Sequence, residues 1–290
     1  MLPFRKVLFP VDYSAPCRAV APYVKEILRR FSAGLTLVHA YGPEALAFSR
    51  LPITDPGLPE AAHEHEQERL REFALEAFPG EHVETFAELG EPGTVIHEII
   101  QHQGADLVMM ATHGRGPIRK LLLGSVAAKV LHDVSTPVWT ASAAQMRRLA
   151  PIPYRSILCA LDDSSEAEGL LKASAALACA YQASLWLVHV VETPVAAPEF
   201  DFTPYNQEAV AAADVWLREL KGQLRAYAPH VDALHVVVDG PVADGVRQEA
   251  IRRDADLIVT GRGRAQTRFS RMWSHLYQIV RESPCPVLSI

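Results

Sequence analysis

The sequence predicts two tandem α/β domains, each built on a parallel β-sheet. Two observations lead to this prediction. The chain repeats itself at a nearly constant offset, and within each copy short apolar runs alternate with helical patterns. Such alternation is typical of a parallel sheet with helices on both faces. The length of 290 residues also suits two domains of ordinary size.

The repeat is visible in four pairs of segments. RKVLFPVDYS, from Arg5, matches RSILCALDDS, from Arg155, which places Asp12 opposite Asp162. LTLVHAY matches LWLVHVV, and GADLVMMATHGRG matches DADLIVTGRGRA, all at an offset of 150 residues. Near the two ends STPVWT matches SPCPVLSI at an offset one residue shorter. We therefore predict domains at residues 1–147 and 152–290, joined by a short linker that contains two prolines.

In the first copy, apolar runs predict the strands and helical patterns predict the helices between them. The strands are expected at Val7–Val11, Leu35–Ala40, His82–Leu89, Asp106–Ala111 and Pro137–Thr140. The helices are expected at about Pro16–Ser32, His63–Ala77, Thr94–Gln103 and Gly124–His132. Apolar runs without strict alternation suit parallel strands that are buried on both faces. Ligands of such sheets bind beyond the carboxyl ends of the strands, so we expect the functional residues there.

Composition and charge exclude several classes of function. Lys and Arg number 28 against 34 Asp and Glu, so the chain lacks the basic excess of a nucleic-acid-binding protein. We see neither a signal peptide nor an apolar stretch long enough for a transmembrane helix, and we expect a cytoplasmic protein without membrane partners. Four well-separated cysteines indicate reduced thiols. We expect Cys285, between two prolines near the C-terminus, to be accessible.

One segment of the first copy has the features of an anion site. His113 and Gly114 follow a predicted strand, and Gly124 and Ser125 open a predicted helix. Glycines let a backbone approach a ligand closely, and a helix N-terminus offers free N–H groups and the positive end of a dipole. Together they suit a phosphate chain. A tight turn followed by a serine cap is the alternative interpretation of the same residues.

Asp12 adds a second element to this site. It ends the first predicted strand, where its carboxylate can accept hydrogen bonds from a ribose or a base amine. Asp12 and Ser14 also precede a predicted helix, so the alternative role is that of a helix N-cap.

The spacing of these residues resembles the ATP-binding pattern of the universal stress protein family. In that pattern two residues separate a first glycine from a second one. Nine further residues separate the second glycine from a Gly-Ser or Gly-Thr pair. Gly114, Gly124 and Ser125 match it, and Ala111 stands at the first glycine. The resemblance spans both copies and includes VLFPVDYS, LVHAY, GEPG and STPVW. It implies an adenosine site lined by Pro10, Asp12, Ala40, Met110 and Ala111, and a phosphate site formed by Gly114, Gly124, Ser125 and Val126, with His113 beside it.

The resemblance also implies a fold and a function. Each domain would be Rossmann-like, with a five-stranded sheet of order 3-2-1-4-5 and the site between strands 1 and 4. The two copies would pair through their last strands as an internal pseudo-dimer, and a further homodimer is conceivable. The implied function is that of an ATP-binding regulatory protein of the stress response, with Mg²⁺ as a companion of the nucleotide.

Two other functions stay open from the sequence alone. One is a weak ATPase or nucleotide hydrolase that uses Asp12, His113 and Mg²⁺. The other is an interaction scaffold without a ligand, in which Ala111 has closed the site. Neither a nucleophile elbow nor a Walker lysine is present, which favours binding over turnover.

The second copy departs from the family pattern. Gly261 restores the first glycine, but Arg264 replaces the second, and Trp273-Ser274 stands in place of Gly124-Ser125. We therefore predict that this domain does not bind ATP in the family manner and that Trp273 packs over the vacated crevice. Four arginines allow a different anion, although solvated side chains are favoured: Arg262, Arg264, Arg268 and Arg271.

Histidines in both copies are interpreted as structural. His39 and His189 occupy equivalent strand ends, which indicates a shared packing or hydrogen-bonding role. His63 and His65 lie in a Glu-rich helical pattern and are expected on a solvated face.

Overall fold

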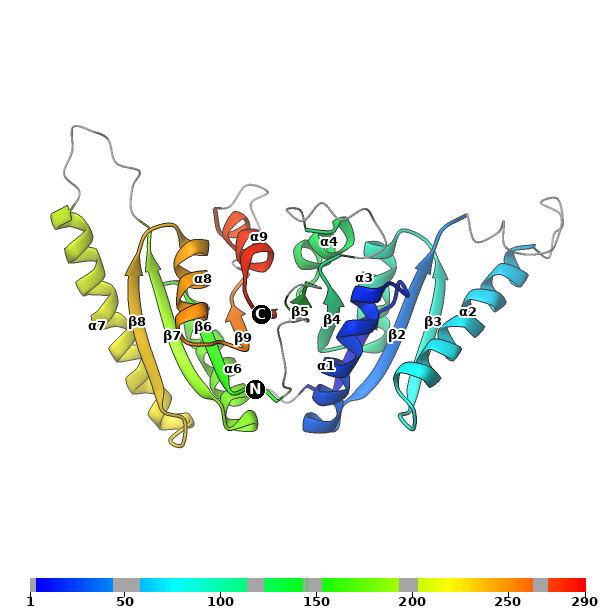
Figure 1. The fold of residues 1–290 in the computed structure, drawn as a ribbon, viewed down its shortest axis with the longest axis horizontal. Coiled ribbons are helices and arrows are strands. Elements are labelled where there is room, and N and C mark those ends of the chain that lie inside the picture. Colours follow the sequence, from blue (N-terminus) through cyan, green and yellow to red (C-terminus); the bar gives the residue numbers. More distant parts are fainter. Residues whose placement is uncertain are drawn as a thin grey trace. The chain divides into compact units, whose positions relative to one another are not determined.

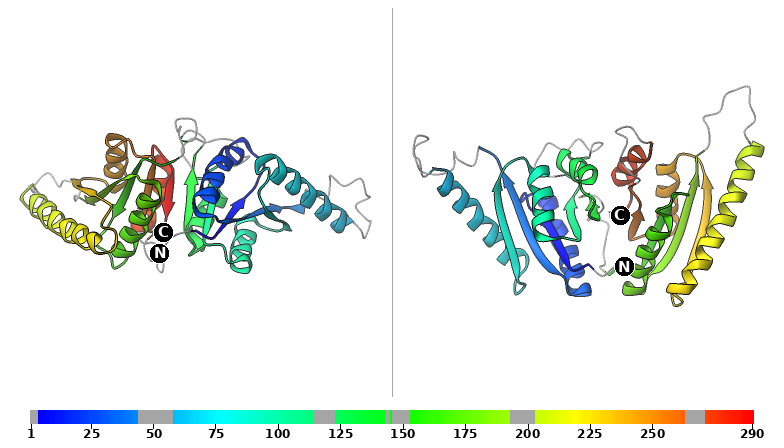
Figure 2. Two further views of the ribbon diagram at one scale, coloured as in Figure 1. Left: turned by 90° about the horizontal axis from the view of Figure 1, so that it is seen from below. Right: turned by 180° about the vertical axis from the view of Figure 1, so that it is seen from behind.

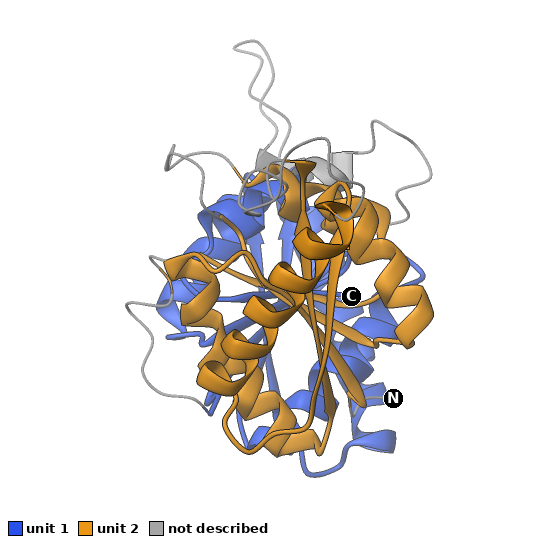
Figure 3. Ribbon diagram, turned by 90° about the vertical axis from the view of Figure 1, so that its right-hand side faces the viewer, with its two compact units in different colours: residues 1–3, 147–290 blue, residues 4–146 orange. Residues whose placement is uncertain are grey.

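The computed structural model describes residues 4–43, 58–113, 123–142, 145, 153–192, 203–262 and 271–290. The chain divides into two compact units, residues 4–146 and residues 147–290 with 1–3 (Figure 3). We call them the N-terminal and the C-terminal unit. The pairing of the two domains through their last strands stays a prediction.

The N-terminal unit alternates strands and helices along the chain (Figure 1). Its strands are β1 (Lys6–Pro10), β2 (Gly34–Tyr41), β3 (Val83–Leu89), β4 (Leu107–Ala111) and β5 (Val138–Ala141). Its helices are α1 (Ala15–Phe31), α2 (Leu58–Ala77), α3 (Pro92–Gln103) and α4 (Ser125–Asp133). The strands are parallel and lie in the order β3-β2-β1-β4-β5.

The C-terminal unit repeats this architecture. Its strands are β6 (Ser156–Leu161), β7 (Ser184–Val191), β8 (Ala233–Asp239), β9 (Leu257–Thr260) and β10 (Val287–Ser289). Its helices are α6 (Ala167–Tyr181), α7 (Thr203–Tyr227), α8 (Val242–Arg252) and α9 (Arg271–Glu282). The parallel order β8-β7-β6-β9-β10 is the same as in the first unit. The predicted α/β fold class and strand order 3-2-1-4-5 are confirmed.

Helices cover both faces of each sheet (Figure 2). In the N-terminal unit α1 and α2 lie on one face, and α3 and α4 pack together on the other. Right-handed crossovers from β1 through β3 run one way along the sheet, and those from β3 through β5 return the other way, which places the helix pairs on opposite faces. No helix among the described residues has the length and apolar content needed to cross a membrane.

The first residue of α2 is the largest departure from the predicted boundaries. The helix begins at Leu58, whereas the periodicity predicted a start near His63. Proline is tolerated in the first turn of a helix, so Pro59 does not stop it. Leu58 and Ala62 are buried and hold this first turn against the core.

An aspartate clamp fixes the amino ends of the central strands in both units. The Asp106 carboxylate, just before β4, accepts hydrogen bonds from the backbone N–H groups of Arg5 and Lys6 at 2.8 and 3.0 Å. In the second unit Asp256 accepts from the N–H groups of Arg155 and Ser156 at 2.6 and 3.0 Å. The two clamps tie neighbouring strands together at their amino ends and fix their register.

Removal of one clamp tests its contribution to stability. We expect Asp256→Ala to lower the free energy of unfolding by about 1–3 kcal/mol, because two backbone donors lose a charged acceptor. Urea denaturation measures the change. Asp232→Ala is the matched control, because Asp232 is exposed next to the start of β8, and it should change stability little. Equal effects of the two substitutions would contradict the clamp.

Candidate functional site

The carboxyl ends of β1, β2 and β4 meet at one edge of the N-terminal sheet. β1 lies between the other two strands, with Pro10 paired to Val38 of β2 and Leu8 paired to Val108 of β4. Pro10 ends β1, and the chain from β1 turns towards β2 while β4 lies on the other side, so the strand order reverses here. Such a reversal opens the crevice in which open α/β sheets bind ligands.

The predicted site residues are found at this edge. Ala40 is the last residue but one of β2, and Met110 and Ala111 end β4. Met110 is buried, while Pro10, Ala40 and Ala111 are partly exposed. Gly114 lies outside the described residues.

Asp12 shapes the turn between β1 and α1. Its Oδ1 accepts hydrogen bonds from the backbone N–H of Ser14 at 3.0 Å and from the Ser14 hydroxyl at 2.6 Å. The Ser14 hydroxyl oxygen in turn accepts from the backbone N–H of Cys17 and caps α1. Ser14 is therefore the N-cap, and Asp12 orients it. Tyr13, between them, adopts a left-handed conformation with φ of 61°.

Gly124 sets the start of α4. It is the N-cap, with φ of −60°, and its N–H donates to the Thr112 carbonyl at 2.9 Å. A Cβ on Gly124 would lie only 2.7 Å from that carbonyl oxygen, so glycine is required by close approach and not by its φ angle. The contact brings the N-terminus of α4 against the end of β4.

Ser125 is the first residue of the helix and not its cap, so the serine-cap interpretation is wrong. Its side chain is exposed. The first N–H groups of a helix have no partner within it, so those of Ser125 and Val126 face outward with the positive end of the dipole. The Nδ1 atom of His113 lies 3.0 Å from the Thr112 hydroxyl oxygen, next to the Gly124 contact. These groups can hold an anionic oxygen.

The first turn of α3 supports α4. Glu91 caps α3 by accepting hydrogen bonds from the backbone N–H groups of Gly93 and Thr94. Desolvation opposes ionisation of Glu91, but these hydrogen bonds, that of the Thr94 hydroxyl and the charge of Lys129 outweigh it and lower its pKa. Lys129 of α4 lies 4.0 Å from Glu91, and its side chain packs on Gly93, where a Cβ would lie 2.5 Å away. The cap of α3 therefore helps to position the helix of the site.

Two buried polar side chains, His39 of β2 and Glu66 of α2, lie next to the carboxyl ends of the strands. The His39 Nδ1 atom donates to the Val11 carbonyl at 2.6 Å, and its Nε2 lies 3.5 Å from a carboxylate oxygen of the buried Glu66. The Tyr13 ring packs on His39, and the Arg69 guanidinium lies 4.1 Å from the centre of the Tyr13 ring. Tyr13, Glu66 and Arg69 were missed by the sequence analysis, although Tyr13 directly follows Asp12.

His189 makes the equivalent bond in the second unit. Its Nδ1 donates to the Leu161 carbonyl at 2.9 Å, so the shared hydrogen-bonding role of the two histidines is confirmed. His63 and His65 are exposed, as expected. The Glu66 side chain of the same helix is buried.

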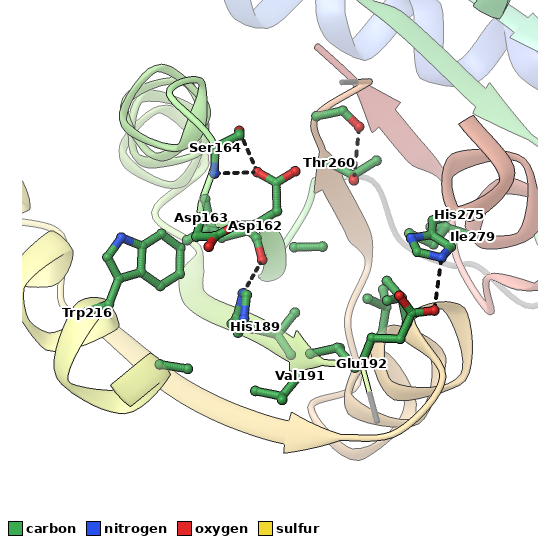
Figure 4. Close-up of a pocket in the computed structure, with 18 of the residues that line it drawn as sticks. Asp162, Asp163, Ser164, His189, Val191, Glu192, Trp216, Thr260, His275 and Ile279 are labelled. Carbon is green, nitrogen blue, oxygen red and sulfur yellow. Dashed lines mark hydrogen bonds and ion pairs between the residues drawn. The ribbon is translucent and has the colours of Figure 1, made fainter. Parts of the chain in front are cut away.

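The C-terminal unit has a pocket of about 720 Å³ at the same edge of its sheet (Figure 4). It is lined by the counterparts of six predicted site residues. These counterparts, in the order of Pro10, Asp12, Ala40, Met110, Ala111 and Val126, are Ala160, Asp162, Val190, Thr260, Gly261 and His275. Asp162 keeps the turn of Asp12 and accepts a hydrogen bond from the Ser164 hydroxyl at 2.6 Å.

The two units differ at the first turn of α4 and of α9, the part of this edge where the family pattern would place phosphates. α9 begins at Arg271, three residues before Ser274, the counterpart of the first residue of α4. Trp273 therefore lies within a helix and does not occupy a cap position like that of Gly124. The side chains of Trp273 and Arg271 lie outside the described part of the chain, as do Arg264 and Arg268 in full. Arg262 donates to the Ser289 carbonyl at 3.2 Å, towards β10.

The cysteines have no features of nucleophiles. Cys285 is only 1% exposed, so the expected accessibility is wrong. Burial raises the pKa of the Cys285 thiol to about 12, and the same cause raises that of Cys17 and Cys159 to about 12. All four cysteines are free thiols, and of these only Cys179 is exposed.

The sequence profile of the universal stress protein family matches residues 3–141 and again residues 153–290. The chain belongs to the universal stress protein family. Among curated members, a universal stress protein of Thermus aquaticus is 33% identical over 135 residues, which cover 47% of this chain and 96% of the relative. One of Methanocaldococcus jannaschii is 25% identical over 151 residues and 93% of its length. Each relative is therefore matched almost entirely by about half of this chain.

Solved structures share the tandem arrangement. A universal stress protein of Archaeoglobus fulgidus superposes with a TM-score of 0.71 at 21% identity, covering 98% of this chain and 97% of its own. One of Pseudomonas aeruginosa superposes with a TM-score of 0.64 at 18% identity, covering 99% of this chain and 93% of its own. At these identities the likeness shows a common fold.

The Gly124 contact can be tested by a single methyl group. We expect Gly124→Ala to lower the free energy of unfolding by about 1–3 kcal/mol, because the added carbon overlaps the Thr112 carbonyl. Gly222→Ala is the control, since Gly222 lies inside α7 with no atom within 4 Å of an added Cβ. It should raise stability by about 0.5–1 kcal/mol through helix propensity. Thermal or urea unfolding distinguishes the two, and effects of the same sign would contradict the close-approach argument.

The Glu91 cap predicts a pH dependence. We expect Glu91→Gln to lower stability at pH 7 by about 0.5–1 kcal/mol. Because the pKa of Glu91 is lower in the folded protein, its stabilisation is complete above the unfolded pKa of about 4.3 and is lost as the pH falls through the folded pKa. The two proteins should converge in acid unfolding experiments. Glu98→Gln, an exposed change on the same helix, should have no such dependence.

Proposed function

We propose that this universal stress protein binds ATP in its N-terminal domain and acts as a regulatory protein of the stress response. The observation that supports this most is the start of α4. Gly124 lies against the Thr112 carbonyl, and the exposed Ser125 opens the first turn of α4 directly after it. The close approach holds the helix N-terminus at the end of β4, and the N–H groups of a first turn have no partner within the helix and can bind a phosphate.

The proposed contacts follow the family pattern residue by residue. Adenosine would lie at the strand ends, and the phosphates would extend to the helix. The adenosine contacts are Pro10, Asp12, Ala40, Met110 and Ala111, and the phosphate contacts are His113, Gly114, Gly124, Ser125 and Val126. The pocket at the equivalent edge of the C-terminal unit supports this location, because six counterparts of these residues line it.

The Asp12 carboxylate would accept a hydrogen bond from a ligand hydroxyl or amine. Its Oδ1 accepts two hydrogen bonds from Ser14, which hold the carboxylate in place. A carboxylate fixed in this way can orient a ribose. When bound with ATP, Mg²⁺ would offset the charge of the phosphates, and the exposed Ser125 hydroxyl is an oxygen ligand of the type that it takes.

We propose that occupancy, rather than turnover, is the output of the domain. The loop between β4 and α4 leads directly into the Gly124 contact, so a bound phosphate chain would stabilise the start of α4 in one position. A ligand shifts a conformational equilibrium by the difference in its affinity for the two states. Partner binding would then respond to the cellular nucleotide level. An internal pseudo-dimer and a further homodimer remain part of this proposal.

Native mass spectrometry of the freshly purified chain, followed by titration with Mg²⁺-ATP, tests the proposal. We expect one ATP per chain. Gly124→Trp, which installs the residue of the other unit, should abolish binding, and Asp12→Asn should weaken it at least about tenfold. Asp162→Asn is the matched control in the other unit and should leave ATP binding unchanged. Absence of binding to the unmodified chain would refute the proposal, and two ATP molecules per chain would refute its restriction to one domain.

A further inference from the structure

The pocket of the C-terminal unit has walls suited to an apolar ring. Buried aliphatic side chains of β7, α8 and α9 form one side, and three alanines of α7 form another. These residues are Val188, Val190, Val246, Leu276, Ile279, Ala209, Ala212 and Ala213. A volume of about 720 Å³ is in the range of small-molecule sites.

Trp216 of α7 supplies an aromatic surface to the same pocket (Figure 4). Its ring packs edge-on against His189, with centroids 5.2 Å apart and an interplanar angle of 69°. His189 is held in turn by its bond to the Leu161 carbonyl. The indole is partly exposed. It is thus a fixed aromatic surface within the lining of the pocket.

The Asp, Glu, Lys and Arg side chains among the described lining residues of the pocket have one sign. Asp162, Asp163 and Glu192 line it, and none of its described lining residues is Lys or Arg. Asp162 and Asp163 follow β6, whereas Glu192 follows β7 and lies 3.6 Å from His275 of α9. Figure 4 shows Asp163 on the side of Trp216, and Glu192 with His275 away from it. Arg262, beside the lining residue Gly261, directs its guanidinium to the Ser289 carbonyl.

Comparison with the first unit shows that three residues of this pocket, Asp163, Glu192 and Trp216, have counterparts of a different type there. Asp163 stands where the first unit has Tyr13, and Glu192 stands where it has Gly42. Trp216 stands where the first unit has Glu66. The residue over the histidine is therefore Tyr13 in one unit and Trp216 in the other, and the second unit has the acidic Asp163 at the position thereby released.

We propose that the C-terminal pocket binds an organic cation, an ammonium group attached to an aromatic or apolar body. The body lies against the aliphatic wall, and the ammonium group faces Asp162 and Asp163 near the Trp216 ring. A cation within a few ångströms of an indole face is attracted by its quadrupole, and carboxylates next to apolar walls strengthen the attraction. A polyphosphate would meet three carboxylates here, and in the sequence Trp273 stands in place of Gly124.

A matched set of probes with one ring and three charges tests this. Phenethylamine, phenethyl alcohol and phenylacetate are titrated into the full chain by calorimetry. We expect the amine to bind at one site, the alcohol to bind at least about fivefold more weakly, and phenylacetate to bind not at all. Higher salt should weaken amine binding and leave alcohol binding unchanged.

Two variants assign the binding to this pocket. Asp163→Asn should weaken amine binding about fivefold or more without affecting the alcohol. Asp232→Asn, also an exposed aspartate of this unit but beside the start of β8, should leave both unchanged. The chain has four tryptophans, so a fluorescence change on amine binding that is lost in Trp216→Phe places the ligand at this ring.

Four results would overturn the proposal. They are equal binding of amine and alcohol, preferred binding of phenylacetate, equal losses in the two aspartate variants, and no binding of the amine. Adenosine and ATP are titrated into the Gly124→Trp chain as well. Tighter binding of either than of the amine would make the pocket a nucleoside or nucleotide site and contradict the assignment to cations.

Discussion

The parallel direction of all strands within each unit is the constraint on which the other features depend. It gathers the carboxyl ends of the strands at one edge and their amino ends at the other. The aspartate clamps lie at the amino edge, where an aspartate before one strand accepts from the backbone N–H groups at the start of the neighbouring strand. The turn of Asp12, the Gly124 contact and the C-terminal pocket all lie at the carboxyl edge. Stability and the proposed ligand binding thus depend on opposite ends of the same strands.

The two units cover an equivalent histidine with aromatic rings from different positions in the chain. Each has a histidine whose Nδ1 donates to a carbonyl at the carboxyl end of the central strand, and each places an aromatic ring on that histidine. In the first unit the ring is Tyr13, from the turn, and the α2 position holds Glu66. In the second unit Trp216 of the equivalent helix supplies the ring, and the turn carries Asp163. This exchange keeps the histidine covered but changes the charge at the mouth of the crevice.

Much of this architecture could be predicted from the sequence, because its signals are local. Buried apolar runs and the 150-residue repeat predicted the strands and the two-domain organisation, and the family resemblance implied the strand order. The repeat also placed His39 and His189 in equivalent roles. The sequence could not indicate that Gly124 is needed for its approach to the Thr112 carbonyl, since that contact joins residues across a loop. It did not predict the C-terminal pocket, because the loss of glycines was taken to mean a filled crevice, whereas the lining side chains come from six separate elements and the turns between them. The burial of Cys285 is likewise a tertiary effect.

The separation of the two edges bears on how such a duplicated chain can change. Substitutions at the amino edge break hydrogen bonds that hold the sheet, so they reduce the folded population whatever the ligand. Those at the carboxyl edge alter charge and shape beside an intact sheet. After duplication, one copy can therefore lose a helix cap, gain acidic groups and acquire a different ligand while its partner domain keeps the ancestral chemistry. A single polypeptide would then report on two unrelated metabolites through one scaffold.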